Sequence, residues 1–401
     1  MTRCASHEGY SLSVPGPHHV LLIPGFFGFA NLNDFAYFGH VRDYLVEAGP
    51  AAGLDGEIRV VETEPTASLR RRAALLTEAI SRLLDESPKG ARVSLVGHSS
   101  GGLDARLAVS PEVNLPTSAD VRRAAAAVPS VLCVSTPHLG TPLAHLLNTL
   151  LGQQLLRVLS VATIYSLRAG RLPLRAVLRL ARLFQRRDMP ADGMIESLAR
   201  DLLADFSKPR RLAIEEFLSH LGNDQDLLGQ ITPGGMDLFN ASTGDRPGVR
   251  YGCVVTRARA PGLRSTISAG IDPYAQATHA LFVALYRLAA RTPTELTPRL
   301  DRAQVIALRR AYDHRPDMTA NDGMVPTLSQ VRGTVVHAAW ADHHDIIGHF
   351  HEPQHVPPHL DWLTSGSGFD RAGFEATWRS VVTWLGGAPG QQQDATGVGL
   401  A

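Results

Sequence analysis

Short apolar runs alternate along the chain with longer segments in which apolar residues recur at every third or fourth position. The runs have the length of strands, and the longer segments have the period of helices that bury one side. This alternation is typical of a mainly parallel sheet, because parallel strands need crossover connections and are covered by helices on both faces. The predicted strands are residues 19–23, 57–62, 92–96, 130–135, 250–255 and 334–340.

Three of the helical segments carry regular apolar stripes, at residues 38–48, 69–83 and 374–385. A stripe of this width is explained by burial against a sheet. We therefore expect these helices to form part of the core layers.

Two long insertions, residues 143–247 and 258–318, break the alternation, and both have helical patterns. Residues 143–187 contain fourteen Leu and eight Arg with no Asp or Glu, so this segment carries +8. One interpretation is a solvated Arg face with its aliphatic side on the core. The other is a mobile amphipathic cap that also rests on a lipid or anionic interface. The expected organisation is a core of residues 18–142 and 248–386 that includes the 258–318 insertion, a helical cap at 143–247 and a disordered tail at 387–401.

Composition and charge exclude several classes of protein. Hydrophobic residues make up 44% and charged residues 19% of the 401-residue chain, which is typical of a folded globular protein. The 39 basic and 38 acidic residues nearly cancel, so no overall field favours nucleic acid. No apolar stretch is long enough to span a membrane, and residues 1–19 hold no secretion signal, which predicts a cytoplasmic protein. Export without a cleavable signal stays compatible with the sequence.

Residues 92–102 read Arg-Val-Ser-Leu-Val-Gly-His-Ser-Ser-Gly-Gly, an apolar strand that runs into a turn and then a helix. This is the pattern of a nucleophile elbow centred on Ser99. A strained turn lifts the serine hydroxyl out of the sheet, and Gly97 and Gly101 let the strand and the helix pack without a side-chain clash. The free N–H groups at the start of the helix favour negative charge that develops near the serine. The pattern predicts that Ser99 is a catalytic nucleophile.

A second strand, residues 20–23, leads directly into a glycine-flanked turn that contains Phe26. In a fold with a nucleophile elbow, this turn donates one backbone N–H to the oxyanion hole, and the residue after the nucleophile donates the other. Phe26 and Ser100 are therefore the predicted oxyanion donors.

A catalytic serine needs a base, and the base needs an orienting carboxylate, in the chain order Ser, acid, His. Asp322 lies in an Asn-Asp-Gly turn, and His343 follows just after the last predicted strand. These two residues are the preferred acid and base. The residues alone leave alternatives open, which are Asp313 or Asp317 for the acid and His344 or His349 for the base.

Five stretches together resemble the bacterial triacylglycerol lipases of the true-lipase family, α/β-hydrolases related to those of Pseudomonas, Burkholderia and staphylococci. Their order along the chain matches that family, and the similarity spreads over residues 18–350. Pro24 departs from the family, whose members usually have His at this position. The stretches are Gly-His-Ser-Ser-Gly-Gly-Leu-Asp-Ala-Arg at 97–106, residues 135–142, residues 228–240, Asn-Asp-Gly at 321–323 and Asp-His-His-Asp at 342–345.

The resemblance implies an α/β-hydrolase fold with a helical lid. It also implies Ser99 as nucleophile and Asp322 as acid. It favours His343 as base over His344, because the family's base stands two residues before an aspartate. That aspartate is Asp345 here, and in some of these lipases it holds a structural calcium ion. No other cofactor is implied.

The expected function is that of a serine carboxylester hydrolase of lipase or esterase type, acting on medium or long acyl chains. Its partners would be an acyl ester or lipid substrate and a lipid interface that meets the Arg- and Leu-rich cap. One alternative is an acyltransferase or thioesterase with the same triad. The other is a catalytically silent binding protein of the same fold.

Residues 351–355 read His-Glu-Pro-Gln-His, which matches the zinc-binding string of helical metalloproteases. That chemistry requires both imidazoles on one face of a helix. Pro353 within the string and Pro357 and Pro358 after it disfavour a helix. We therefore expect no zincin motif here, and we expect the other histidines to be surface or packing residues.

Overall fold

A computed structural model describes most of the chain. The described residues are 16–26, 37–111, 113–149, 161, 173–185, 192–209, 211–212, 226–292, 297–356, 358–359, 361 and 363–387.

The six predicted strands form one sheet in which every neighbouring pair is parallel, with the order β2-β1-β3-β4-β5-β6. The prediction of an α/β fold with a mainly parallel sheet is thus confirmed. The edge strand β2 is shorter than the sequence suggests. The strands are β1 (His18–Ile23), β2 (Ile58–Val60), β3 (Arg92–His98), β4 (Ser130–Val134), β5 (Arg250–Arg257) and β6 (Thr334–Trp340).

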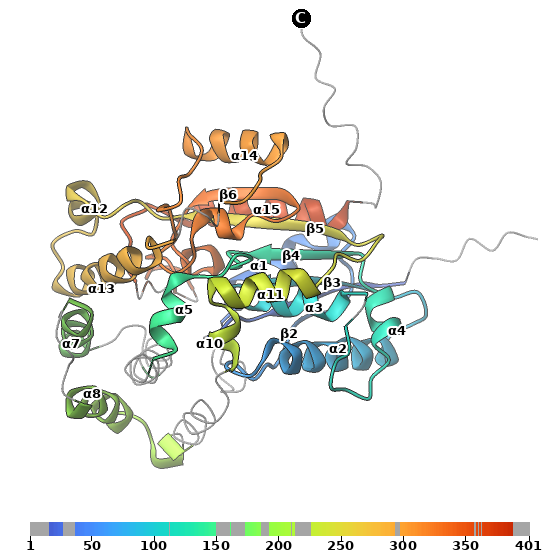
Figure 1. Ribbon diagram of the computed structural model, residues 1–401, viewed down its shortest axis with the longest axis horizontal. Coiled ribbons are helices and arrows are strands. Elements are labelled where there is room, and N and C mark those ends of the chain that lie inside the picture. Colours follow the sequence, from blue (N-terminus) through green and yellow to red (C-terminus); the bar gives the residue numbers. More distant parts are fainter. Residues whose placement is uncertain are drawn as a thin grey trace, which may run out of the picture.

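Helices cover both faces of the sheet (Figure 1). Successive strand residues point to opposite faces, so Val20 and Leu22 of β1 pack with α1 (Gly39–Ala48) and α15 (Arg371–Gly386). Leu21 and Ile23 pack on the other side. That side is covered by α2 (Leu69–Glu86), α3 (Gly101–Val109) and α4 (Val121–Ala126).

The three predicted apolar stripes are buried, as in α1, where Val41 and Leu45 are the buried residues. The β6 edge of the sheet is covered by α14 (Arg302–Tyr312). The Tyr312 hydroxyl of that helix donates to the backbone oxygens of Val255 and Ala339.

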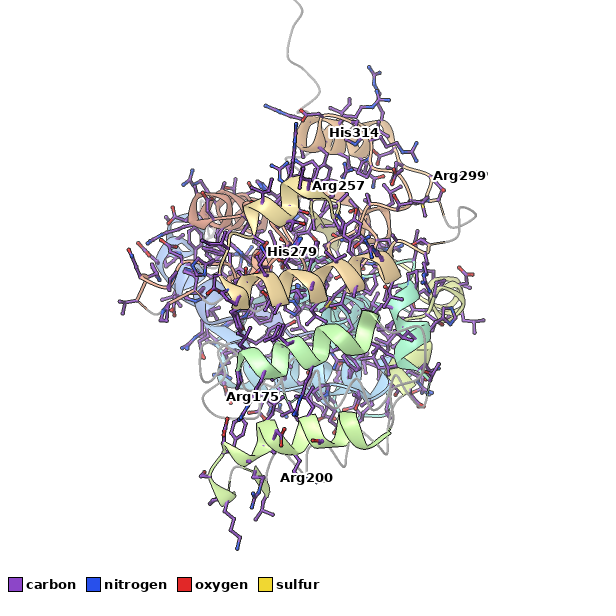
Figure 2. The ribbon with its side chains drawn as sticks, turned by 90° about the vertical axis from the view of Figure 1, so that its left-hand side faces the viewer. Arg175, Arg200, Arg257, His279, Arg299 and His314 are labelled. Atoms are coloured by element: carbon purple, nitrogen blue, oxygen red, sulfur yellow. The ribbon has the colours of Figure 1, made fainter. Side chains whose placement is uncertain are left out.

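The described parts of the two insertions are helical. Helices α5, α7, α12 and α13 gather at the end of the sheet where the strands terminate, on the left in Figure 1. Figure 2 views this end, where α7 lies between α13 and α8 and carries Arg175, with Arg200 on α8. The helices are α5 (Pro142–Leu147), α7 (Leu174–Gln185), α8 (Asp192–Ala204), α10 (Asp226–Gln230), α11 (Pro233–Ser242), α12 (Leu263–Ser268) and α13 (Pro273–Ala289).

Parts of the predicted cap, and the predicted tail after Gly387, lie outside the described residues. None of the described helices is long and apolar enough to cross a membrane. Residues 351–356 form turns and bends with no helix, as the prolines predict. Short 3-10 helices are η1 (Pro50–Ala52), η3 (Thr327–Gln330) and η4 (Asp345–Ile347).

Candidate active site

Ser99 lies in the tight turn between the end of β3 and the start of α3, with a φ of 55°. Residues that carry a side chain rarely adopt this left-handed backbone conformation, so the turn stores strain. A Cβ on Gly97 would lie 2.4 Å from the carbonyl carbon of Gly101, and one on Gly101 would lie 2.2 Å from the backbone oxygen of Ile23. The turn therefore has the geometry that the elbow pattern predicts, and Ser99 remains partly exposed.

The turn after β1 packs directly against Ser99. A Cβ on Gly25 would lie 2.5 Å from the Ser99 Cβ and 3.1 Å from its Oγ. Phe26 follows Gly25 and is buried, whereas Ser100 is the N-cap residue of α3. The N–H groups at the start of a helix lack partners within it. The two predicted oxyanion donors thus lie on the two segments that border Ser99.

Asp322 and His343 form a buried pair at the carboxyl end of the sheet. The His343 Nδ1–H donates to Asp322 Oδ2 over 2.8 Å, and the His343 backbone N–H donates to the Asp322 backbone oxygen over 3.0 Å. Both residues are almost fully buried. A proton on Nδ1 leaves Nε2 of His343 as the nitrogen that can accept a proton.

The Asp322 carboxylate is held by further donors. Oδ1 accepts from the backbone N–H groups of Met324 and Val325 at 3.0 and 2.7 Å. Oδ2 accepts from Thr256 Oγ1 at 2.8 Å and from Gln330 Nε2 at 3.1 Å. Sequence reasoning missed Thr256 and Gln330, because neither belongs to a motif. The position of Thr256 near the carboxyl end of an apolar strand is the one signal that pointed to it.

The alternative acids lie at the surface, whereas the alternative base His344 lies beside His343, with ring centroids 5.3 Å apart. Asp313 and Asp317 are exposed, and Asp317 Oδ1 accepts hydrogen bonds within its own turn. His344 and His349 are buried, and His349 Nε2 lies 3.3 Å from the backbone oxygen of Tyr37. The structure therefore brings Asp322 together with His343 and keeps the alternative acids at the surface.

His98 links the elbow to the base, and sequence reasoning did not single it out. Burial holds the pKa of His98 well below its ordinary value, so the ring is neutral with one N–H. Its Nδ1 lies 2.6 Å from the Tyr37 hydroxyl and its Nε2 lies 2.9 Å from the His343 backbone oxygen. A carbonyl can only accept, so Nε2 donates and Nδ1 accepts from Tyr37. The Tyr37 hydroxyl in turn accepts from the Gly25 N–H at 3.4 Å.

A buried ion pair supports the same region. Arg72 of α2 and Asp104 of α3 are both fully buried and lie 2.6 Å apart. Arg72 also donates to the Pro24 backbone oxygen at 2.9 Å, one residue before Gly25. The pair therefore connects the helix after the elbow to the turn after β1.

Two further stretches that carry the lipase resemblance meet in space. The guanidinium of Arg106 lies 3.1 Å from His138 Nδ1 and donates to Asn240 Oδ1 at 3.2 Å. Asn240 donates to the His138 backbone oxygen at 2.7 Å. Burial lowers the pKa of Arg106 to about 10. This network joins α3, the segment after β4 and α11.

Three carboxylates gather beside His343. One carboxylate oxygen from each of Asp342, Asp345 and Asp361 lies within 4.8 Å of the others. Burial, with the neighbouring charge of Asp361, raises the pKa of Asp342 to about 8. Asp342 Oδ2 is buried without a hydrogen-bond partner in the described part of the chain. An all-oxygen set with an unsatisfied buried oxygen fits a hard cation such as Ca²⁺.

Comparison with known proteins bears on the fold and on part of the site. Residues 67–171 match the family model described as "Putative serine esterase (DUF676)", a stretch that includes Ser99 and Ser100. No curated protein matches the chain.

The chain is also similar to solved structures of lipases and esterases. Lipase 1 from Pelosinus fermentans matches with a TM-score of 0.51 and 14% identity, over 92% of this chain and 99% of that one. The lipase of Staphylococcus hyicus matches with a TM-score of 0.47 and 16% identity, over 92% of this chain and 95% of that one. EstA from Clostridium botulinum matches with a TM-score of 0.49 and 17% identity, over 94% and 89%. The match to the Pelosinus lipase shows that the chain has the α/β-hydrolase fold of lipase structures.

Proposed function

We propose that the protein is a serine carboxylester hydrolase of lipase or esterase type. The observation that carries the proposal is the buried Asp322–His343 hydrogen bond beside the strained elbow of Ser99. The family match over residues 67–171 and the α/β-hydrolase fold support it.

In this proposal Ser99 Oγ attacks the ester carbonyl while His343 Nε2 takes its proton. Asp322 keeps the proton of His343 on Nδ1 and stabilises the imidazolium that forms. The backbone N–H groups of Phe26 and Ser100 bind the negative oxygen of the tetrahedral intermediate. His343 then protonates the leaving alcohol, and water, activated by the same imidazole, hydrolyses the acyl-enzyme.

Medium or long acyl chains are the proposed substrates, because apolar side chains are exposed at the end of the sheet that carries the site. Leu174 and Leu178 of α7 are 38% and 41% exposed. On and just after α12, Leu263, Ile267 and Ile271 are 78%, 68% and 98% exposed. Large apolar side chains exposed at this end of the sheet suit a surface that contacts lipid or apolar ligands. This face would rest on the lipid interface that supplies the substrate.

We further propose that Asp342, Asp345 and Asp361 hold a structural Ca²⁺ ion. Asp342 Oδ1 accepts from the backbone N–H groups of His344 and Asp345, and Asp345 Oδ2 accepts from the Asp342 N–H. Because His343 lies within this folded segment, an ion bound there would hold the position of the base.

The proposed activity is tested with p-nitrophenyl esters from acetate to palmitate. Ser99→Ala and His343→Ala should each lower kcat/KM by at least about 10³-fold with the fold intact. His349→Ala is the matched control and should retain most of the activity. If His343→Ala stayed active and His344→Ala or His349→Ala did not, the assignment of the base would be wrong.

The same assay separates the alternatives. Activity on palmitate that rises when the substrate is dispersed supports a lipase, whereas activity confined to acetate and butyrate would contradict the proposed chain length. Transfer to added alcohols in preference to water, or faster cleavage of thioesters, would identify an acyltransferase or a thioesterase. Failure of a fluorophosphonate to label Ser99 would identify a silent binding protein.

Calcium binding is tested by removing metal with EGTA and measuring thermal unfolding. Stability and esterase activity should fall with EGTA and return with Ca²⁺. Asp361→Asn should abolish this response, whereas the exposed control Asp317→Asn should keep it. An unchanged melting temperature with and without Ca²⁺ would contradict the proposal.

A further inference from the structure

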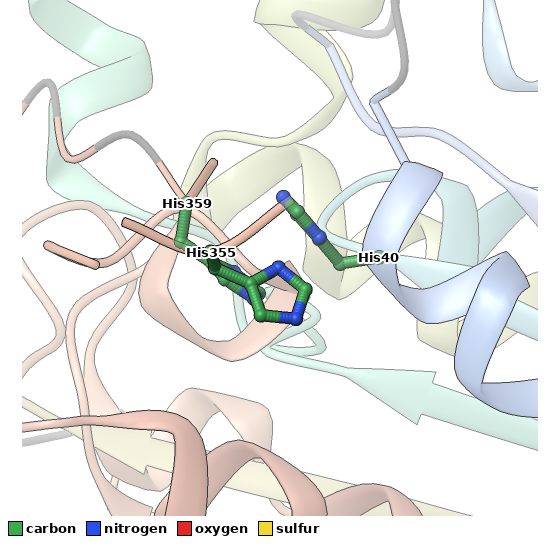
Figure 3. A group of neighbouring side chains, drawn as sticks. All are labelled: His40, His355 and His359. Atoms are coloured by element: carbon green, nitrogen blue, oxygen red, sulfur yellow. The ribbon is translucent and has the colours of Figure 1, made fainter. Parts of the chain in front are cut away.

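The loop that carries His343 continues into a segment held by stacked rings. The His359 ring stacks with that of His40 on α1, at 3.6 Å between centroids (Figure 3), and with that of Phe350, at 4.2 Å. Its Nδ1 donates to the Gly348 backbone oxygen over 2.7 Å, since a carbonyl can only accept. Ring packing and this hydrogen bond anchor the segment after the base, whereas the orientation of the acid depends on other elements.

Ser135 directly follows β4 and has a φ of 50°. Left-handed backbone at a residue with a Cβ is strained, and it persists where the surrounding structure or the function requires it. Among the described residues, the other non-glycine positions with a positive φ are Ser99 and Asp313. Asp313 is the exposed residue that ends α14, whereas Ser135 is fully buried. An exposed turn at a helix end therefore does not explain the conformation of Ser135.

The peptide group between Val134 and Ser135 joins two neighbouring strands. The Val134 carbonyl accepts from the Ser99 N–H over 2.8 Å, and the Ser135 N–H donates to the Val254 backbone oxygen over 3.0 Å. Ser99 directly follows β3, and Val254 belongs to β5. One peptide group at the end of β4 thus holds the turn of the nucleophile on one side and β5 on the other.

The side chain of Ser135 leads to the acid. Ser135 Oγ lies 2.8 Å from Thr256 Oγ1, which lies 2.8 Å from Asp322 Oδ2. A carboxylate accepts, so the single hydroxyl proton of Thr256 points to Asp322, and Ser135 donates to Thr256. All three side chains are fully buried. Hydrogen bonds shielded from water in this way are strong and polarise one another. The same Asp322 oxygen accepts from His343 Nδ1.

Gln330 fixes Thr256 relative to the acid. Its Nε2 donates to Asp322 Oδ2 over 3.1 Å and to the Val325 backbone oxygen over 3.2 Å. Its Oε1 accepts from the Thr256 backbone N–H over 2.7 Å. The nitrogen faces acceptors and the oxygen faces a donor, which defines the orientation of the amide. The backbone of Thr256 is therefore held by the same side chain that binds the acid beside its hydroxyl.

We propose that Ser135 and Thr256 are positioning residues for the proposed esterase reaction. The Ser135 hydroxyl orients that of Thr256, which holds Asp322 Oδ2 opposite His343 Nδ1. The backbone beside Ser135 holds the turn of Ser99 at the same time. The strained conformation serves this double contact, which sets the separation of the nucleophile and the acid and so the alignment that the reaction needs. The kinetic effects rest on the proposed function, whereas the geometry of the acid and the base does not.

The first test removes the hydroxyl that binds the acid. Thr256→Val should lower kcat on one ester by at least about tenfold with little change in KM, because hydrogen bonds to a charged group are among the stronger ones. Thr256→Ser keeps the hydroxyl and should restore kcat to within about threefold of the original. Thr77→Val is the matched control, since Thr77 is fully buried and donates to the Ala73 backbone oxygen within α2. Equal kcat in the two valine variants would overturn the proposal.

The second test separates function from stability at Ser135. Ser135→Gly removes the hydroxyl and relieves the strain, so kcat should fall about fivefold while the melting temperature stays within about 3 °C. Ser135→Ala keeps the strain and should lose as much activity with a lower melting temperature. Asp313→Gly, which relieves the same strain at the surface, is the matched control and should keep its kcat. Equal kcat in the two glycine variants, or a melting temperature that falls together with kcat, would contradict a positioning role.

A spectroscopic readout separates this proposal from the esterase proposal. In the proton NMR spectrum, the proton that His343 donates to Asp322 should resonate downfield of the backbone amides and be absent in His343→Ala. Thr256→Val should shift or broaden this signal, and Thr77→Val should leave it in place. An unmoved signal in Thr256→Val would refute the positioning role even in an active enzyme. A moved signal in a protein without esterase activity would support the positioning of the pair and refute the proposed function alone.

Discussion

Tyr37 connects three parts of the candidate site through a single hydroxyl group. It accepts from the Gly25 N–H in the turn after β1 and donates to His98, which in turn holds the backbone oxygen of His343. The turn that carries Phe26 and the loop that carries the base are thereby set at a defined separation. Each of these contacts positions a neighbouring group of the candidate site.

Tyr37→Phe should lower kcat about fivefold with little change in KM, because one hydrogen bond contributes about 1 kcal/mol. The loss would come from a displaced base and oxyanion turn rather than from weaker substrate binding. Tyr44→Phe is the matched control, since its hydroxyl contacts the Glu375 backbone oxygen on α15. Steady-state kinetics on one ester measure kcat and KM of both variants. An effect on KM alone would contradict a positioning role.

The β3–α3 elbow shows how one element constrains its neighbours. Gly101 is the first residue of α3, and its Cα faces the backbone of β1 rather than a side chain that could move. A side chain at this position would push the helix away from the strand and displace Ser99.

Gly101→Ala should therefore destabilise the fold by about 3 kcal/mol and lower activity with it. Gly234→Ala is the matched control, because Gly234 also lies in the first turn of a helix, α11, and has open space around it. We expect that variant to stay within about 1 kcal/mol of the original stability. Chemical denaturation of both variants measures the difference, and equal stabilities would show that the strand and the helix can separate at no cost.

The elements were largely predictable from the sequence, because strands buried on both faces consist of continuous apolar runs. Their ends were less predictable, as in β2, which is only Ile58–Val60 and pairs with β1 alone. The order of the strands in the sheet is set by long-range packing, which no local pattern records. For the same reason the contacts of Gln330 with Asp322, and of His40 with His359, could not be read from motifs.

At the scale of the whole molecule, a row of buried polar side chains joins the amino ends of three strands. His18, at the start of β1, is 3% exposed, and its Nε2 lies 2.7 Å from Ser94 Oγ on β3. Ser94 Oγ lies 2.7 Å from Ser130 Oγ on β4. This row of hydrogen bonds crosses three strands and ties the sheet together at the end opposite the candidate site.

The environment of His18 disfavours its charged form. Burial is the main cause, and the positive charges of Arg92 and Arg250 and the neighbouring His19 act in the same direction, against the attraction of Asp55. Together they lower the pKa of His18 from 6.5 to about 4. The unfolded chain therefore takes up a proton at this residue at a higher pH than the folded chain does.

The stability of the fold should consequently decrease as the pH falls from about 6.5 to about 4, and His18 should cause part of the decrease. Above this window the residue is neutral in both states, and below it the residue is charged in both, so the slope from His18 is confined to the window. The full effect is on the order of 3 kcal/mol, at about 1.4 kcal/mol for each pKa unit. His18→Gln keeps a polar group near Ser94 that does not titrate, so its free energy of unfolding should depend less steeply on pH between 4 and 6.5. Urea denaturation of both proteins across this range measures the two slopes, and parallel curves would show that the folded protein does not keep His18 neutral.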